Sequence, residues 1–152
     1  MMKKFMKKLW DKKDSKKGFT LVELIVVLVI LGILLAILVP TLTAWIDKAK
    51  NQQLALNART VLIAAQSAQA EAYGENPSVL AEKEDVEAYL NLDEIKGTWK
   101  VTVSEDYKTV TKFEYQEGKL VMTYEDGTWS GPKETTETIS NAVEKETSGS
   151  AG

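Results

Sequence analysis

Apolar and polar residues divide this chain of 152 residues into segments of different character. The longest apolar segment runs from Phe19 to Val39, and its only polar side chains are Thr20 and Glu23. At about 1.5 Å per helical residue the run is about 31 Å long, which matches the hydrocarbon core of a bilayer. The pattern therefore predicts a membrane-spanning helix at residues 19–40.

A second helical segment follows the apolar run directly. Neither Gly nor Pro occurs from residue 41 to residue 73, so we expect the helix to continue over residues 41–74 and to end at Gly74 in a left-handed cap. Pro40 removes one helical N–H, and Gly32 is a second weak position. We therefore expect a kink or a locally unwound stretch between these two residues.

The continuation of the helix carries apolar residues on two faces. A stripe of mostly small residues recurs at intervals of four and three, namely Leu54, Ala58, Val61, Ala65, Ala68 and Ala72. Another stripe recurs every seven residues, namely Ala49, Leu56, Ile63 and Ala70. A helix that only covers a sheet needs one apolar face, so the second stripe favours contact with neighbouring subunits. The alternative is that an Ala-rich helix tolerates apolar residues outside its core face.

The rest of the chain predicts a connection, a sheet and a tail. Residues 75–98 begin with turn-forming residues and then mix acidic with apolar ones, which predicts a connecting region with a short helix. Residues 99–130 alternate apolar with polar side chains, as in an antiparallel β-sheet of three to four strands. Residues 131–152 are mostly polar, and we expect a mobile tail, or one helical turn around residues 139–144. The fold class is α+β, with the long N-terminal helix packed on a small sheet.

Side-chain alternation also predicts how the strands pair. A two-residue turn at residues 117–118 would place Tyr115 opposite Leu120, which keeps the apolar residues of both strands on one face. The apolar residues of the preceding strand, which begins at Trp99, lie on the same face if Val101 is opposite Phe113. We expect this common face to pack on the Leu54 to Ala72 stripe.

Charge is distributed unevenly along the chain. Residues 1–18 carry a net charge of +6 and the remainder carries −9. Basic residues beside a membrane span favour the cytoplasmic side, so we expect the basic leader in the cytoplasm and the acidic domain outside the cytoplasmic membrane. An acidic domain also argues against nucleic-acid binding, which needs clustered Lys and Arg.

The residue types limit the available chemistry. The chain has no Cys and no His, which excludes thiol and imidazole catalysis and the commonest zinc and copper ligands. It contains no Gly-rich phosphate loop and no nucleophile–base pair. The carboxylates at residues 82–87 and 125–126 could be drawn as calcium ligands, but an exposed acidic face is their ordinary explanation. We predict no enzymatic activity, no cofactor and no metal site.

Glu23 is the one charged residue inside the apolar run. A lone carboxylate in hydrocarbon costs about 2.5–3.5 kcal/mol and marks a functional position by default. No Lys, Arg or His lies between Phe19 and Trp45 to pair with it. Cleavage after Gly18 would create an α-amino group on Phe19, largely protonated at neutral pH. In staggered neighbouring chains this ammonium could pair with Glu23 of another copy and so specify their register.

The sequence Gly-Phe-Thr-Leu-Val-Glu-Leu at residues 18–24 follows a basic leader and precedes Gly32 and Pro40. This combination resembles the class III signal of type IV pilins and their pseudopilin relatives, over about residues 16–50. The leader of residues 1–18 is longer than the very short leaders typical of the Phe-first subclass. The resemblance implies a prepilin that a membrane-embedded prepilin peptidase cleaves between Gly18 and Phe19 and methylates on the nitrogen of Phe19.

The resemblance also implies partners and a destination. Glu23 and Phe19 would guide docking into a growing filament, and the helix would loosen between Gly32 and Pro40 after assembly. The implied partners are other copies of the chain, minor pilins, the peptidase, an assembly platform protein and an assembly ATPase. The precursor would be a single-pass protein of the cytoplasmic membrane, and the mature subunit would form a pilus on the cell surface.

The sequence is compatible with several functions. Retention of Glu23 favours a main pilin, but a pseudopilin of type II secretion or of competence DNA uptake has the same architecture. A low-copy adhesive subunit and a membrane-anchored binding domain that never polymerises are further alternatives. The residues do not distinguish motility, adhesion, secretion and DNA uptake. An ordinary secretory signal is disfavoured because the apolar core is too long and no suitable cleavage site follows it.

Overall fold

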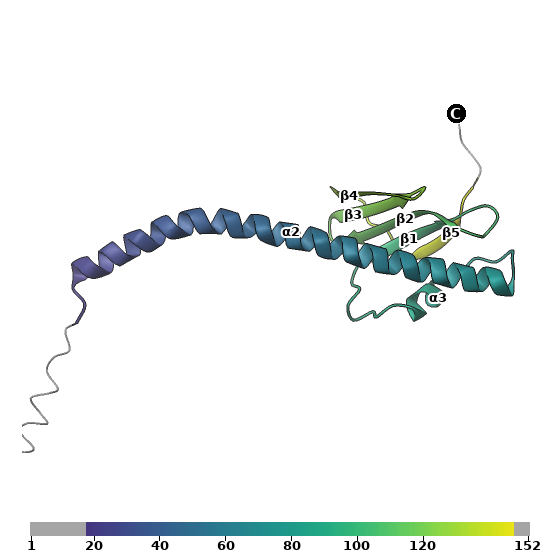
Figure 1. Ribbon diagram of the computed structural model, residues 1–152, viewed down its shortest axis with the longest axis horizontal. Helices are drawn as coiled ribbons and strands as arrows, with labels where there is room; N and C mark the ends of the chain where they lie inside the picture. The colour runs from purple at the N-terminus through teal and green to yellow at the C-terminus, as the bar shows by residue number, and fades with distance from the viewer. Residues whose placement is uncertain (1–17, 148–152) are drawn as a thin grey trace, which may run out of the picture. The chain divides into compact units, whose positions relative to one another are not determined.

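The computed structural model describes residues 18–147, which form two compact units. One unit ends at Trp45 and the other begins at Ile46. The main helix, α2 (Leu21–Glu75), has its N-terminal part in the first unit and its C-terminal part in the second (Figure 1). The second unit, here called the head, also contains a short helix, α3 (Lys83–Ala88), and a five-stranded sheet.

The helix α2 is continuous through both of its weak positions. Gly32 and Pro40 lie inside it, so the unwound stretch expected between them is absent from this structure. A single missing hydrogen bond does not unwind a helix whose other backbone groups pair internally. Beside the proline, the Thr41 and Thr43 hydroxyls donate to the carbonyls four residues earlier, at 3.1 and 2.8 Å. The prediction of an unwound stretch is therefore wrong for this structure, whereas a kink, the other alternative for this segment, stays a prediction.

The C-terminal end of α2 differs slightly from the prediction. The helix ends at Glu75, one residue beyond Gly74, and Gly74 does not adopt the left-handed conformation expected of it. The Asn76 amide donates to the Ala72 carbonyl at 2.9 Å. Pro77 then disfavours helical backbone at the residue before it, which ends the helix.

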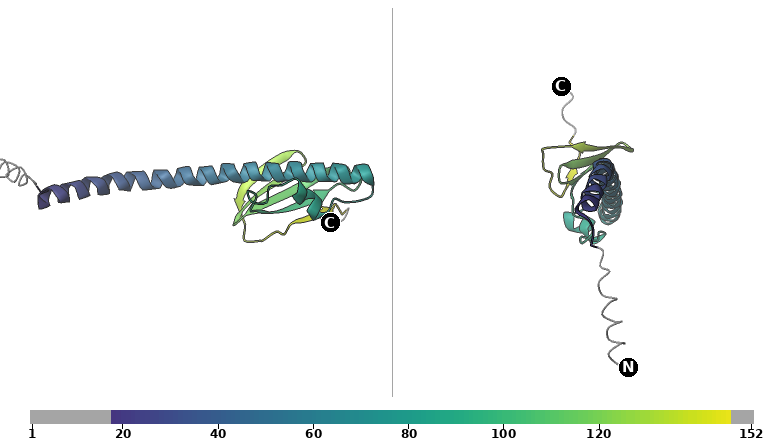
Figure 2. Two further views of the ribbon diagram at one scale, coloured as in Figure 1. Left: turned by 90° about the horizontal axis from the view of Figure 1, so that it is seen from below. Right: turned by 90° about the vertical axis from the view of Figure 1, so that its left-hand side faces the viewer.

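The sheet consists of β1 (Thr98–Val103), β2 (Val110–Glu117), β3 (Leu120–Glu125), β4 (Thr128–Glu134) and β5 (Ala142–Lys145). Their order is β4-β3-β2-β1-β5 (Figure 1), and the sheet lies against one side of the C-terminal part of α2 (Figure 2). The first four strands pair antiparallel, whereas β5 pairs parallel to β1. The α+β class is confirmed, but the expected antiparallel sheet of three to four strands is a mixed sheet of five.

Strand pairing agrees with the sequence prediction in one hairpin and departs from it in the next. Val101 lies opposite Phe113, as expected. The following turn is at residues 118–119 and not 117–118, so Tyr115 pairs with Met122 and not with Leu120. The observed pairing of β3 with β2 is shifted by two residues from the predicted pairing. Because side chains alternate between faces, a shift of two residues leaves every side chain on its predicted face.

The fifth strand forms within the segment for which we expected a mobile tail. The Gln116 side chain, only 5% exposed, donates to the Glu137 carbonyl at 2.7 Å and accepts from the Ile139 amide at 2.9 Å. Asn141 then accepts a hydrogen bond from the Trp99 amide at 2.9 Å. These long-range contacts hold the C-terminal segment beside β1, and nothing in its local sequence indicates them.

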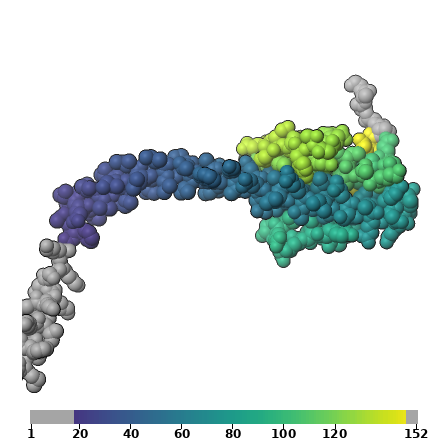
Figure 3. Space-filling view, in the orientation of Figure 1, coloured from purple at the N-terminus to yellow at the C-terminus, as the bar shows by residue number. Residues whose placement is uncertain are grey.

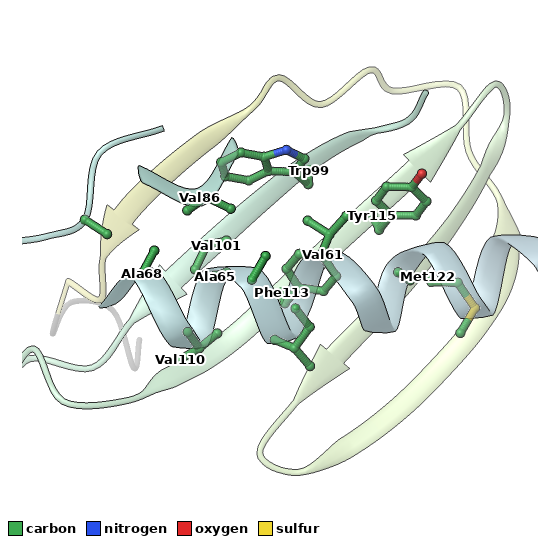
Figure 4. Close-up of a cluster of buried hydrophobic side chains, with 14 of the residues drawn as sticks. Val61, Ala65, Ala68, Val86, Trp99, Val101, Val110, Phe113, Tyr115 and Met122 are labelled. Atoms are coloured by element: carbon green, nitrogen blue, oxygen red, sulfur yellow. The ribbon is translucent and has the colours of Figure 1, made fainter. Parts of the chain in front are cut away.

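The core of the head lies between α2 and one face of the sheet (Figure 4). The predicted stripe supplies the helix side: Leu54, Ala58, Val61, Ala65 and Ala68 are at most 2% exposed, and Ala72 packs at the margin. On the sheet, the fully buried aromatic residues are Trp99, Phe113 and Tyr115. Each large buried side chain contributes about 1.5–3 kcal/mol. Small helix residues permit close approach to these rings, which explains the Ala-rich pattern.

A buried glutamine fastens two loops to the helix. Gln69 of α2 is 1% exposed. Its amide nitrogen donates to the Val79 and Tyr107 carbonyls at 3.2 and 2.9 Å, and its carbonyl accepts from the Ala81 amide at 2.9 Å. One side chain thereby joins α2 to the connection before α3 and to the β1–β2 turn.

We predict that Gln69→Leu destabilises the head by about 2–4 kcal/mol, because it leaves buried backbone groups of two loops without partners. Chemical unfolding of the full chain in detergent, followed by near-ultraviolet circular dichroism of the buried Trp99, measures the change. The exposed neighbour Gln66→Leu is the matched control and should change stability by less than about 0.5 kcal/mol. Equal stability of the two variants would contradict the anchoring role of Gln69.

Candidate functional site

The candidate site lies where the chain enters α2. Gly18, Phe19 and Thr20 are not helical, and all three are exposed. The Phe19 side chain is 86% exposed, and a side chain added at Gly18 would meet no atom within 4 Å. The bond between Gly18 and Phe19 therefore lies in open, non-helical backbone directly before the helix.

Thr20 fixes the position at which the helix begins. Its hydroxyl accepts a hydrogen bond from the Glu23 amide at 3.2 Å, and its carbonyl accepts one from the Leu24 amide at 3.1 Å. This is the geometry of a helix N-cap, with Glu23 at the third helical position. Thr20 is absent from the site residues predicted from the sequence, although Thr-x-x-Glu before an apolar run is a recognised signal for a helix start.

Glu23 lies in the first turn of α2, where a negative charge is favoured by the helix dipole. Among residues 18–147, the four ion pairs lie in the head, and none of them includes Glu23. The structure places Thr20 and Glu23 together and leaves the carboxylate of Glu23 exposed. Within residues 18–147, no Lys or Arg side chain forms an ion pair with Glu23.

The first turns of α2 carry apolar side chains on every side. No residue from Gly18 to Lys50 is buried or half-buried, and the space-filling view shows this segment, in purple and blue, bare on the visible face (Figure 3). In hydropathy and length the N-terminal part of α2 qualifies as a membrane span, and none of it is buried. Water is a poor solvent for such a surface, whereas lipid or other apolar helices are suitable surroundings.

The other two predicted site residues lie further along this helix. Gly32 and Pro40 are both exposed within α2, and a side chain added at Gly32 would meet no atom within 4 Å. The structure therefore does not bring them near Gly18, Phe19 or Glu23. Their expected role in helix flexibility remains a prediction.

A polar network in the head is a second candidate site. The Tyr115 hydroxyl donates to the Glu117 carboxylate at 2.5 Å, and the Asn57 amide donates to the same carboxylate at 2.7 Å. Burial raises the pKa of Tyr115 far above its usual range, and the hydrogen bond to Glu117 adds to the effect. Such a phenol stays protonated, so the arrangement holds β2 against α2 and supplies no base.

Carboxylates are the charged metal-binding side chains in the part of the chain that the structure describes. No three or more Asp and Glu side chains there come together in a way that could hold a metal ion. The acidic residues at 82–87 and 125–126 lie on the surface of the head, and most are exposed. The chemically distinctive part of residues 18–147 is thus the junction at residues 18–23.

Comparison with known families bears on this junction. The model of the prokaryotic N-terminal methylation motif matches residues 13–39, which include Gly18, Phe19 and Glu23. The chain carries the N-terminal signal of the type IV pilin and pseudopilin family. Searches of curated proteins and of solved structures gave no match. For this pilin-like chain, the apolar helix together with the motif indicates a membrane-anchored precursor.

We predict that Thr20→Val frays the start of α2, because valine keeps the shape of threonine but cannot accept the hydrogen bond from the Glu23 amide. Loss of an N-cap costs about 0.5–2 kcal/mol, which corresponds to about 2- to 30-fold faster exchange of that amide hydrogen. Nuclear magnetic resonance of the precursor in detergent micelles measures this exchange. Thr20→Ser should restore protection, and Thr41→Val should leave the Glu23 amide unchanged. Equal exchange in Thr20→Val and in the unchanged protein would rule out the cap.

Proposed function

We propose that the chain is the precursor of the main subunit of a type IV pilus. A prepilin peptidase cleaves it after Gly18 and methylates the new amino group of Phe19. The mature subunit then leaves the cytoplasmic membrane and polymerises through the apolar part of α2 into a surface filament. Its other partners are minor pilins, an assembly platform protein and an assembly ATPase.

The observation that carries this proposal is the match of the methylation motif to residues 13–39. The local geometry is consistent with cleavage, since the bond between Gly18 and Phe19 is exposed and non-helical. Thr20 starts the helix two residues after Gly18, so the cleavage site stays outside the regular backbone. A protease needs such backbone because the hydrogen bonds of a helix would otherwise have to break before cleavage.

Assembly follows from the physical state of the apolar helix. Within lipid, apolar side chains gain no hydrophobic energy by meeting one another, so specific packing and polar contacts decide helix association. An ammonium on Phe19 of one copy and the carboxylate of Glu23 of another would supply such a contact. At 4 Å this pair is worth about 4 kcal/mol at an effective dielectric constant of about 20. The pair would select one stagger between neighbouring helices.

The decisive test is the N-terminus of the protein released from cells. N-terminal sequencing and intact mass of protein sheared from the cell surface should show a chain that starts at methylated Phe19. A chain that retains Met1 and occurs only in membranes would identify a plain anchor and overturn the proposal.

We predict that Gly18→Asp blocks cleavage and leaves the precursor in the membrane. The space beside Gly18 is open, so the block would arise at the peptidase and not from misfolding. Immunoblotting for the uncut and cut forms measures the effect. We expect cleavage to be at least about tenfold slower, which corresponds to an increase of about 1.4 kcal/mol in the activation free energy. Gly74→Asp, at another open glycine, is the matched control and should be processed normally. Normal cleavage of Gly18→Asp would remove the assignment of the signal.

We also predict that Glu23→Ala is cleaved normally but gives at least about tenfold fewer filaments. Loss of an ion pair worth more than about 1.4 kcal/mol lowers the affinity of docking by more than about tenfold. Quantifying sheared filaments against total cut subunit separates assembly from processing. Glu105→Ala, which removes an exposed carboxylate from the β1–β2 turn, should assemble like the unchanged protein. If Glu23→Ala assembled equally well, the ion pair would have no role in docking.

A further inference from the structure

A groove opens between the last turns of α2, the loop after it and α3, which lie side by side (Figure 1). It has a volume of about 510 Å³, and its apolar lining includes Ala72, Val79 and Leu80. Val79 is 42% exposed, so apolar surface remains open to solvent there. Polar and apolar atoms line the groove together, as in surfaces that bind an amphipathic partner.

Four carboxylates surround this acidic groove, and they belong to Glu71, Glu75, Glu82 and Asp85. None of them takes part in the four ion pairs found among residues 18–147. Glu71 accepts a hydrogen bond from the Tyr89 hydroxyl at 2.6 Å, and Asp85 accepts one from the Glu82 amide at 2.7 Å. The donors of these bonds, a hydroxyl and a backbone amide, are neutral. The negative charge of the groove therefore has no cationic partner among the described residues, and it favours a cationic partner from another molecule.

A surface with the matching character lies on the outer side of α2. Leu56 and Ile63 are 58% and 62% exposed, and Arg59 lies between them. Residues spaced by three, four and seven share one face of a helix, so these three side chains form a single patch, here called the Leu56 face. Arg59 is exposed and takes part in none of the ion pairs among the described residues. The patch thus combines two large apolar side chains with one cation.

We propose that the Leu56 face of one copy docks in the acidic groove of a second copy. Leu56 and Ile63 cover the exposed apolar lining around Val79, and the Arg59 guanidinium pairs with the carboxylates of the rim. This inference rests on the proposed function, because it assumes that mature subunits assemble. It adds the contact between heads to the contact between apolar helices.

The geometry of this contact leads to an open-ended assembly. The Leu56 face and the acidic groove are different surfaces of one head, so their pairing is heterologous and each bound copy exposes a free groove or a free face. The Leu56 face has three side chains, whereas a standard protein interface has about 20–30 residues a side. The contact therefore requires the high local concentration that the apolar helices provide within a filament.

Cross-linking can test the contact cleanly because the chain has no cysteine. The full chain carrying both Leu56→Cys and Val79→Cys is expressed as the only copy, and cell-surface filaments are sheared and oxidised. We expect a ladder of dimers, trimers and longer species on a non-reducing gel. Each single variant should remain monomeric, since a heterologous contact never brings two identical positions together. The pair Leu56→Cys with Glu105→Cys is the matched control and should also give monomers.

Charge reversal tests the role of Arg59 in the same assay. Arg59→Glu in the double-cysteine chain should reduce cross-linked species about tenfold, and so should Glu75→Arg. Combining the two reversals should restore most of the ladder, because the charges are again complementary. Lys119→Glu, an exposed reversal away from the patch, should leave the ladder unchanged.

The outcomes separate this inference from the proposed function. Filaments of cut subunits that show no ladder would overturn the contact but leave the proposed function unaffected. The same result is expected if another basic protein occupies the groove. Recovery of only uncut chains in membranes would overturn the proposed function and, with it, the contact. A ladder that survives Arg59→Glu unchanged would also overturn the contact as described.

Discussion

The exposed apolar surface of α2 is the constraint on which the rest of this protein depends. From Leu21 to Val39 every side chain of the helix is exposed, and almost all are apolar. At about 25 cal/mol per Å², covering such a surface is strongly favourable, so the helix requires lipid or other apolar helices around it. The basic leader, the N-cap at Thr20 and the charge of Glu23 all act at one end of this surface. In the proposed function, they determine how the precursor is oriented, cleaved and docked.

Two opposite faces of one helix meet different requirements in the head. The face with Ala58, Val61 and Ala65 is buried against the aromatic residues of the sheet. The face with Leu56 and Ile63 remains exposed, although leucine and isoleucine are among the residues most often buried. An apolar surface that the chain itself does not cover is available for other copies. The helix can thus serve as the spine of the head and as a contact surface in an assembly.

The head achieves its fold without disulfides, through a small core and a few buried amides. Gln69 and Gln116 each bind two or more backbone groups from segments far away in sequence. Because an unpaired buried backbone group costs about 1–3 kcal/mol, these side chains specify where each loop lies as well as stabilising it. Removal of a single amide would release a whole segment, and in the case of Gln116 this segment includes β5.

The sequence by itself determined the features that depend on local pattern. These are the membrane helix, the signal at residues 18–24, the buried stripe of α2 and the faces of β1 to β3, because periodicity and turn residues act over a few neighbours. Only the tertiary structure decided the turn at Gly118, where Asn57 of α2 binds Glu117 at the end of β2, and the strand β5, which Gln116 and Asn141 hold in place. Contacts between residues distant in the sequence leave no periodic trace, so they appear only once the chain has folded.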